Sequence, residues 1–416
     1  MNVGAEDNEA SVSASSSGAL SRSERATLIG TWFGWMLDGM DVMIFSFVMP
    51  TLIALWSIST GEAGILGTST LLFSAVGGWL AGIAADRYGR VKVLQITILW
   101  FAFFTFLSGF TNSFGQLFIT RSLMGLGFGG EWAVGSVLIA EAIRGRHRGK
   151  AVGFVQGGWA IGWGLAALCY TVAFSVLDPE LAWRVMFWIG LSPAVLVFYI
   201  RRRVPESAVF QRTTERGGAM GIFGEGVLRT TVLASLVALG VQGGYYAVTT
   251  WLPLFLRTTR GLSVMSTGGY LFVIVAGSFA GYLVAAVLAD RIGRRNTIFV
   301  FAVGSITSVC LYTLLVLTNA QILVLGFPLG FFASGAFSPI GSFFAELFPT
   351  RVRGSGQGFS YNLGRGLGAL FPALVGILTA SQWPLPVSIA VFAAGAYSLM
   401  IAATLLLPET RGRTLD

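Results

Sequence analysis

Residues 29–56 read IGTWFGWMLDGMDVMIFSFVMPTLIALW, an apolar segment with two acids near its middle. The segment is long enough to cross the roughly 30 Å hydrocarbon core of a bilayer as a helix. An ionised carboxylate at that depth costs roughly 2.5 to 3.5 kcal/mol, so we expect Asp38 and Asp41 to face protein or water rather than lipid. At a spacing of three residues both lie on one helical face, which Phe45 extends by one turn. Two interpretations stay open: a structural pair satisfied by neighbouring helices, or a proton or ion site on a transport path.

The composition indicates an integral membrane protein. Of the 416 residues, 54% are hydrophobic and 11% are charged, against about 25% charged in a soluble domain. Cys169 and Cys310 both lie in apolar segments, which argues against a disulfide framework or a thiolate metal cluster. The single histidine, His147, lies in a basic loop, so neither a histidine metal site nor a histidine proton relay is expected. We expect no cofactor and no metal, and any proton transfer falls to carboxyl groups.

Twelve apolar segments have transmembrane length, and they predict an all-α integral membrane protein. Their expected ranges are 28–56, 63–84, 93–111, 116–141, 150–176, 183–201, 229–256, 266–288, 297–318, 321–346, 355–379 and 384–407. The terminal tails and the loops after the even-numbered segments hold 22 of the 27 Lys and Arg residues, whereas the other side holds Arg184, Arg257 and Arg260. The positive-inside rule therefore predicts a multi-pass protein of the cell (inner or plasma) membrane with both termini in the cytoplasm. The net charge of +8 is then a topology signal, so no nucleic-acid partner is expected.

The two halves of the chain repeat each other. Asp86-Arg-Tyr-Gly-Arg90 recurs 204 residues later as Asp290-Arg-Ile-Gly-Arg294, and Pro205-Glu-Ser207 recurs 203 residues later as Pro408-Glu-Thr410. Such a duplication predicts two pseudo-symmetric six-helix bundles that rock around a site near the membrane midplane. The expected divisions are a disordered cytoplasmic tail at 1–27, an N-terminal bundle at 28–201, a cytoplasmic loop at 202–228, a C-terminal bundle at 229–407 and a cytoplasmic tail at 408–416.

Three motifs carry a family resemblance. Gly82-Ile-Ala-Ala-Asp86-Arg-Tyr-Gly-Arg90 resembles the signature loop of the major facilitator superfamily, although the second copy has Ala286 in place of the first glycine. Arg121-Ser-Leu-Met-Gly125-Leu-Gly127 and Pro408-Glu-Thr-Arg-Gly-Arg413 are similar to two further motifs of that superfamily. The resemblance spans about residues 28–413 and implies the major facilitator fold of twelve transmembrane helices in two bundles.

Finer resemblances concern the substrate. Asp38-Gly-Met-Asp41 is similar to a motif of aromatic-acid:proton symporters, and Gly364-Arg-Gly-Leu-Gly368 is similar to an arginine motif shared by those proteins and the sialate and lactate symporters. Gly129-Gly-Glu-Trp132 looks more like other metabolite:proton symporters. Together these resemblances imply a carboxylate substrate.

The chemistry of the charged residues suggests a division of labour. Arg365 stays charged, and its planar guanidinium can bind a carboxylate through two parallel hydrogen bonds. The alternative is that Arg365 forms a structural ion pair with an acid of the protein. Asp38, Asp41 and Glu131 are the candidates for proton coupling, because a carboxyl group can gain or lose a proton according to its burial and neighbouring charges. Further polar residues at similar depth are candidates for substrate binding, with interhelical hydrogen bonding as the equal alternative for each. They are Gln156, Gln242, Tyr245, Tyr246, Tyr361 and Asn362.

The repeated loop residues are candidates for gating, because charged contacts there can latch one conformation, and the resemblance implies control of the inward/outward equilibrium. Pure topology anchoring explains the arginines equally well, but not the repeated acids. The set comprises Asp86, Arg87, Gly89, Arg90, Glu141, Arg148, Asp290, Arg291, Gly293, Arg294, Glu346 and Arg353.

One apparent nucleotide motif fails on context. Gly125-Leu-Gly-Phe-Gly-Gly130 matches the dinucleotide fingerprint in letters, yet it lies inside an apolar segment with no preceding strand. Small residues at such positions instead let helices approach closely, as we also expect for Gly158 with Gly162 and for Gly364 with Gly368.

The sequence therefore predicts a proton-coupled symporter that imports a small organic anion, with a mono- or aromatic carboxylate favoured. Its expected partners are the anion, protons and the lipid bilayer, and we expect a monomer. The alternatives are a proton-coupled exporter of cationic or neutral amphiphiles, a sugar porter, and a nontransporting membrane sensor on a transporter scaffold. An enzyme is not expected, because no nucleophile–histidine pair or cofactor motif is present.

Overall fold

The computed structural model describes residues 20–142, 145–206, 222–349 and 352–411, which form helices joined by short connections. The N-terminal bundle contains α2 (Arg22–Trp56), α3 (Thr60–Tyr88), α4 (Arg90–Ser108), α5 (Phe114–Ala142), α6 (Gly145–Val176), α7 (Pro179–Ile189) and α8 (Pro193–Arg203). The C-terminal bundle contains α10 (Leu228–Thr249), α11 (Leu252–Thr258), α12 (Val264–Ile292), α13 (Arg294–Leu314), α14 (Asn319–Gly335), α15 (Ile340–Leu347), α16 (Arg353–Gly368), α17 (Leu370–Ala380) and α18 (Leu385–Leu405).

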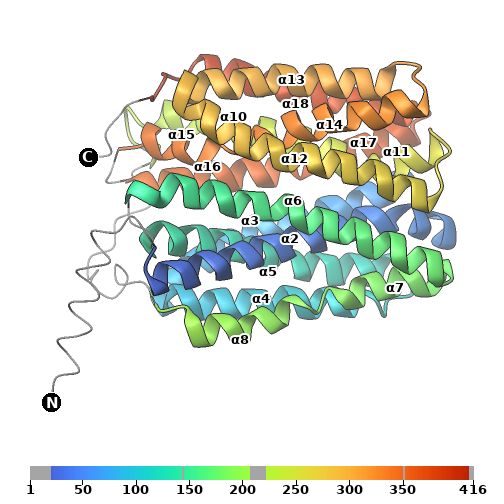
Figure 1. The fold of residues 1–416 in the computed structure, drawn as a ribbon, viewed down its shortest axis with the longest axis horizontal. Helices are drawn as coiled ribbons and strands as arrows, with labels where there is room; N and C mark the ends of the chain where they lie inside the picture. Colours follow the sequence, from blue (N-terminus) through green and yellow to red (C-terminus); the bar gives the residue numbers. More distant parts are fainter. Residues whose placement is uncertain (1–19, 143–144, 207–221, 350–351, 412–416) are drawn as a thin grey trace.

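The helices run along the long axis of the molecule, and α2 begins at the same end at which α18 finishes (Figure 1). We call this end the termini face. Among the described residues, eleven segments can cross a membrane by length and composition, and α5, with 29 residues, is a further long helix. The expected twelve-helix membrane fold is thus confirmed. Four of the twelve segments are each divided into two helices, and a proline lies at or near each division: Pro193, Pro253, Pro339 and Pro372.

The first helix begins earlier than the sequence predicted. Ser21 and Glu24 form a capping box, in which the Glu24 amide donates to the Ser21 hydroxyl (3.2 Å) and the Ser21 amide donates to the Glu24 carboxylate (2.7 Å). These bonds satisfy backbone groups that would otherwise lack partners, so the helix extends back to Arg22. Most of the tail expected at 1–27 lies outside the described residues.

Glycines bring neighbouring helices into backbone contact, as the sequence predicted. A Cβ at Gly129 on α5 would overlap the carbonyl oxygen of Ser74 on α3, and a Cβ at Gly162 on α6 would overlap that of Met36 on α2. In the other bundle, Gly364 on α16 packs equally closely against Ala238 on α10. The glycine run of α5 is therefore a helix-packing surface and not a nucleotide loop.

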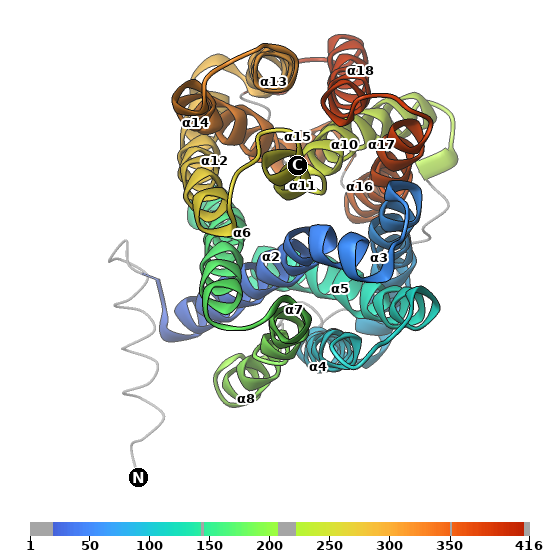
Figure 2. The same ribbon diagram turned by 90° about the vertical axis from the view of Figure 1, so that its right-hand side faces the viewer.

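The two bundles meet along two seams. Viewed from the end opposite the termini face, α6 lies beside α12 and α3 lies beside α16 and α17 (Figure 2). Towards that opposite end, the Thr60 hydroxyl donates to the Gly376 carbonyl (3.2 Å) and the Ala373 amide donates to the Thr68 hydroxyl (3.1 Å). Nearer the middle, the Trp159 indole on α6 donates to the Tyr245 hydroxyl on α10 (2.8 Å). Side chains of both bundles are thus brought together at mid-depth.

Candidate functional site

Arg365 is a buried cation at the interface of the bundles. It projects from α16, is 2% exposed, and its guanidinium carbon lies 4.2 Å from the centre of the Phe128 ring on α5 of the other bundle. The Tyr246 hydroxyl lies beside the guanidinium. Within the described part of the chain Arg365 forms no salt bridge, and its Nε and Nη1 atoms are buried without a hydrogen-bond partner. A buried guanidinium in this state can accept an anionic ligand.

Asp38 and Glu131 form an acid pair close to that cation. Both side chains are buried, and their carboxyl groups on α2 and α5 lie within hydrogen-bonding reach of each other. Arg365 is near enough for its charge to act on Asp38. Glu131 lies across Gly34 of α2, where a Cβ would overlap its Oε1 atom. Two carboxylates in contact inside a protein repel each other strongly when both are ionised, so this arrangement is suited to holding a proton.

Asp41 belongs to a separate group. Its Oδ2 atom lies 3.5 Å from Nη1 of Arg121 on α5, and each side chain is 1% exposed. The Arg121 guanidinium also lies over the rings of Phe45 (5.4 Å) and Phe187 (5.7 Å). The single acidic face expected on α2 is thus divided: Asp41 and Phe45 face Arg121, whereas Asp38 faces Glu131.

Four of the polar residues expected at mid-depth lie on α10 and on α16, the helix that carries Arg365. The Tyr246 hydroxyl donates to the Gln242 side chain (3.4 Å), whose amide donates to the Tyr361 carbonyl (3.0 Å). Tyr245 accepts the bond from Trp159 across the interface. These four residues therefore form a connected polar and aromatic lining between α10 and α16.

The remaining two candidates lie at the edges of this set. Asn362 donates to the Gly358 carbonyl of its own helix (3.0 Å), while its Oδ1 atom is buried, has no hydrogen-bond partner among the described residues, and faces Gly78 of α3. Gln156 is buried on α6, three residues before Trp159. Asn362 thus lies on the α3 seam and Gln156 on the α6 helix that forms the other seam.

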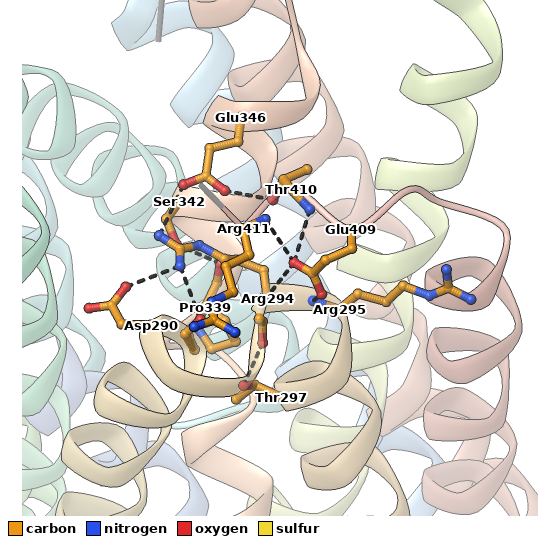
Figure 3. Close-up of polar contacts among 12 residues, drawn as sticks. Asp290, Arg294, Arg295, Thr297, Pro339, Ser342, Glu346, Glu409, Thr410 and Arg411 are labelled. Atoms are coloured by element: carbon orange, nitrogen blue, oxygen red, sulfur yellow. Dashed lines mark hydrogen bonds and ion pairs between the residues drawn. The ribbon is translucent and has the colours of Figure 1, made fainter. Parts of the chain in front are cut away.

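At the termini face, the second copy of the loop motif forms a charge cluster (Figure 3). Arg294 contacts Asp290 and Glu346, each at 3.1 Å, and Glu346 accepts a hydrogen bond from the Thr410 hydroxyl (2.6 Å). Arg291 is exposed beside this cluster. The cluster joins the start of α13, the end of α15 and the segment after α18, so it is placed to resist relative movement of these elements.

The first copy of the motif is only partly described. Gly89 and Gly293 adopt φ of 101° and 98°, a region that favours glycine, and they precede α4 and α13. Arg90 donates to the Ala85 carbonyl (2.9 Å), as Arg294 does to Ala289 (3.0 Å). The side chains of five expected gating residues lie outside the described set: Asp86, Arg87, Glu141, Arg148 and Arg353.

Two carboxylates that cap helices were not predicted from the sequence. Glu206 accepts from the backbone amides of Arg90 (3.0 Å) and Val91 (3.2 Å), and Glu409 accepts from those of Arg294 (2.9 Å) and Arg295 (3.1 Å). Each carboxylate neutralises the positive end of a helix dipole. The repeated Pro-Glu pair was the signal that could have identified them.

Arg121 and Phe128 were also not predicted as site residues. Arg121 was known as a charge inside a membrane segment, and such a charge needs a partner. Phe128 follows two turns later on the same helix and gave no signal of its own.

Comparisons with known proteins agree with the fold. Residues 31–372 and 277–415 match the model of the Major Facilitator Superfamily. A "Probable 4-methylmuconolactone transporter" of Cupriavidus pinatubonensis is 43% identical over 397 residues, covering 94% of this chain and 92% of the relative. The cis,cis-muconate transport protein of Acinetobacter baylyi is 32% identical over 356 residues, covering 82% and 84%. Among solved structures, the proton:xylose symporter XylE bound to 6-bromo-6-deoxy-D-glucose has a TM-score of 0.74 at 19% identity, covering 94% of this chain and 98% of that chain, a likeness of fold alone.

Proposed function

Because this chain belongs to the Major Facilitator Superfamily, we propose that it is a proton-coupled symporter that imports a small organic anion, a mono- or aromatic carboxylate. The observation that carries the proposal is Arg365, a buried guanidinium at the bundle interface that has no described salt-bridge partner and lies beside an acid pair. A cation held at this depth is costly unless an anion or a nearby carboxylate compensates it.

In this proposal Arg365 binds the carboxylate of the substrate. Its fork can make two parallel hydrogen bonds to a carboxylate, which a lysine cannot. Phe128 and Tyr246 hold the guanidinium, and the lining of Gln242, Tyr245 and Tyr361 surrounds the body of the substrate. Relatives named for muconate and 4-methylmuconolactone support a small organic acid as the substrate.

The acid pair supplies the coupling. When Asp38 and Glu131 share one proton, their remaining negative charge balances Arg365, and the empty site is neutral. A carboxylate on Arg365 adds one negative charge, which a second proton on the pair cancels. Substrate and proton therefore favour each other's binding, which is the condition for symport. The Asp41–Arg121 pair is a second place where a proton can act, because protonation of Asp41 breaks a buried ion pair.

The two bundles provide alternating access. Rocking about the α3 and α6 seams exposes the central site first to one side of the membrane and then to the other. The positive-inside distribution of Lys and Arg supports assigning the termini face to the cytoplasm of the inner (plasma) membrane. The cluster around Arg294 then holds the helices of the C-terminal bundle together at the cytoplasmic face while that bundle moves. A monomer suffices, since both bundles come from one chain.

The test is uptake of a panel of radiolabelled carboxylates into proteoliposomes, with and without an inward proton gradient. Accumulation that requires the gradient and is lost in Glu131→Gln supports acid symport. If no carboxylate moves and cationic dyes leave against the gradient, the proposal is wrong and an exporter is favoured.

A further inference from the structure

A buried polar stripe runs along α2 from the termini face to the acid pair. Glu24, Thr27, Thr31 and Asp38 are spaced by three or four residues (with Gly34 filling the remaining position), so they lie on one side of the helix. Each of the four is less than a tenth exposed. At 1.5 Å per residue the stripe covers roughly 21 Å, from the first helical turn to the centre of the bundle. The stripe leads from the first turn of α2 to Asp38, and an ionisable residue at that depth indicates a pathway or a site.

A small cavity adjoins this stripe on the side of the termini face. It has a volume of about 10 Å³ and is lined by Gly30, Thr31, Trp35, Leu94, Glu131 and Gly135. That volume is close to the minimum that admits one water molecule. Along α2, Thr31 lies about two turns closer to the termini face than Asp38. Along α5, Gly135 lies about one turn closer to that face than Glu131. The cavity therefore lies on the side of Glu131 that faces the termini. Asp38 and Arg365 lie on its other side.

Glu131 lines this cavity, and its carboxyl group is incompletely bonded. One of its oxygens, Oε1, lies against Gly34, whereas Oε2 is buried and has no hydrogen-bond partner within the described residues. The Thr31 hydroxyl donates to the Thr27 carbonyl (2.7 Å) and retains its capacity to accept. The lining thus offers a water both a carboxyl group and a hydroxyl acceptor.

We propose that this cavity is a water site through which Glu131 exchanges its proton with the solvent at the termini face, along the α2 stripe and apart from the substrate's own path. This inference rests on the proposed function, which makes the acid pair the proton carrier. The water takes a proton from the Glu131 carboxyl group and passes one of its own to the next water towards Glu24, so only a proton is moved. The substrate then leaves from Arg365 between the bundles, while the proton leaves within the N-terminal bundle.

The glycine at position 135 provides a sharp test, because an alanine methyl there occupies part of the cavity and requires only a small shift of the Thr31 side chain. A Cβ at Gly135 would lie 3.3 Å from the nearest atom, Cγ2 of Thr31. The matched control is Gly115→Ala on the same helix, where an added Cβ meets nothing within 4 Å. Both changes replace a glycine of α5 by alanine, but only Gly135 lines the cavity. Thr31→Val is the second variant, which keeps the shape and removes the hydroxyl.

Two rates are compared in proteoliposomes containing the full chain. The first is carboxylate accumulation driven by an inward proton gradient, which requires proton release in every cycle. The second is exchange of labelled for unlabelled carboxylate at equal pH, which requires binding and rocking without proton release. We expect Gly135→Ala and Thr31→Val to lower accumulation at least tenfold and to change exchange less than twofold, while Gly115→Ala matches the unmodified protein in both.

The outcomes separate this inference from the proposed function. If the unmodified protein accumulates a carboxylate and Gly135→Ala accumulates it equally fast, the water route is wrong and the symport proposal stands. If both variants lose exchange together with accumulation, the two residues are structural and the water route is again wrong. If the unmodified protein shows no gradient-driven accumulation, the proposed function itself fails.

Discussion

The guanidinium carbon of Arg365 lies 4.2 Å from the centre of the Phe128 ring, so a buried cation of one bundle stacks on an aromatic ring of the other. A flat guanidinium on a ring keeps its edge free, and the edge carries the donors that a carboxylate needs. Phe128 and Glu131 lie one turn apart on α5, so one helix face presents both the stacking ring and an acid of the pair. In this conformation the cation therefore lies beside the acids, although they belong to different bundles.

We predict that Arg365→Lys raises the KM for the transported carboxylate at least about tenfold. The charge remains, but the planar fork and the stack on Phe128 are lost, and a charge-assisted hydrogen bond contributes about 1.5 to 3 kcal/mol. Initial uptake rates over a range of substrate concentrations measure the change. Arg411→Lys, at an exposed position, is the control and should leave KM unchanged. An unaltered KM in Arg365→Lys would exclude its binding role.

Asp41→Asn should destabilise the protein by about 3 kcal/mol, because it leaves Arg121 buried without its countercharge. The double variant Asp41→Asn with Arg121→Gln removes both charges, so we expect most of that stability to return. Thermal unfolding in detergent measures both effects. Proton-driven accumulation should stay lost in the double variant, and its recovery there would show that the pair serves structure alone.

Glu409→Gln should lower the free energy of unfolding by about 1 to 2 kcal/mol, because the amide keeps only one of the two acceptor oxygens that cap α13. Glu206→Gln should do the same at α4, and the two losses should add, since the sites lie in separate bundles. Glu180→Gln breaks only an exposed pair with Arg184 and should change stability by less than about 1 kcal/mol. Equal stability of all three variants would refute the capping role.

Gly162→Ala should greatly reduce the yield of folded protein, because its methyl group would overlap the backbone of Met36 and force α2 away from α6. Gly395→Ala on α18 adds the same methyl where nothing lies within 4 Å, so it should be neutral or slightly stabilising. Size-exclusion profiles in detergent compare the two. Normal folding of Gly162→Ala would show that this helix crossing tolerates a wider spacing.

The fold was predictable because each membrane segment must be about twenty apolar residues long, and because the motif around Arg90 is repeated around Arg294. Arg365 and Glu131 were predictable as site residues for a related reason: a charge in an apolar segment stands out. What lies opposite each charge was not predictable, since that depends on how helices are rotated about their axes.

Asp38 and Asp41 illustrate this limit. Positions three apart on a helix differ by about 60° in direction, which is close enough to suggest one shared face and wide enough to reach two different neighbours. Asp41 therefore pairs with Arg121, which the sequence had left unassigned, while Asp38 meets Glu131. The caps by Glu206 and Glu409 escaped prediction in a similar way, because they depend on long-range contacts between the end of each half and its third segment.

These caps also bear on how the chain is made. The carboxylates of Glu206 and Glu409 follow the sixth membrane segment of each half, yet they complete a helix that the ribosome produced more than 100 residues earlier. The start of α4 therefore gains its cap only after the sixth segment of the first half has been synthesised, and α13 gains its cap only after Glu409 has been added. In each half the third segment is thus the first to be made of the two elements that the cap joins, and its N-terminus is completed by a residue made later.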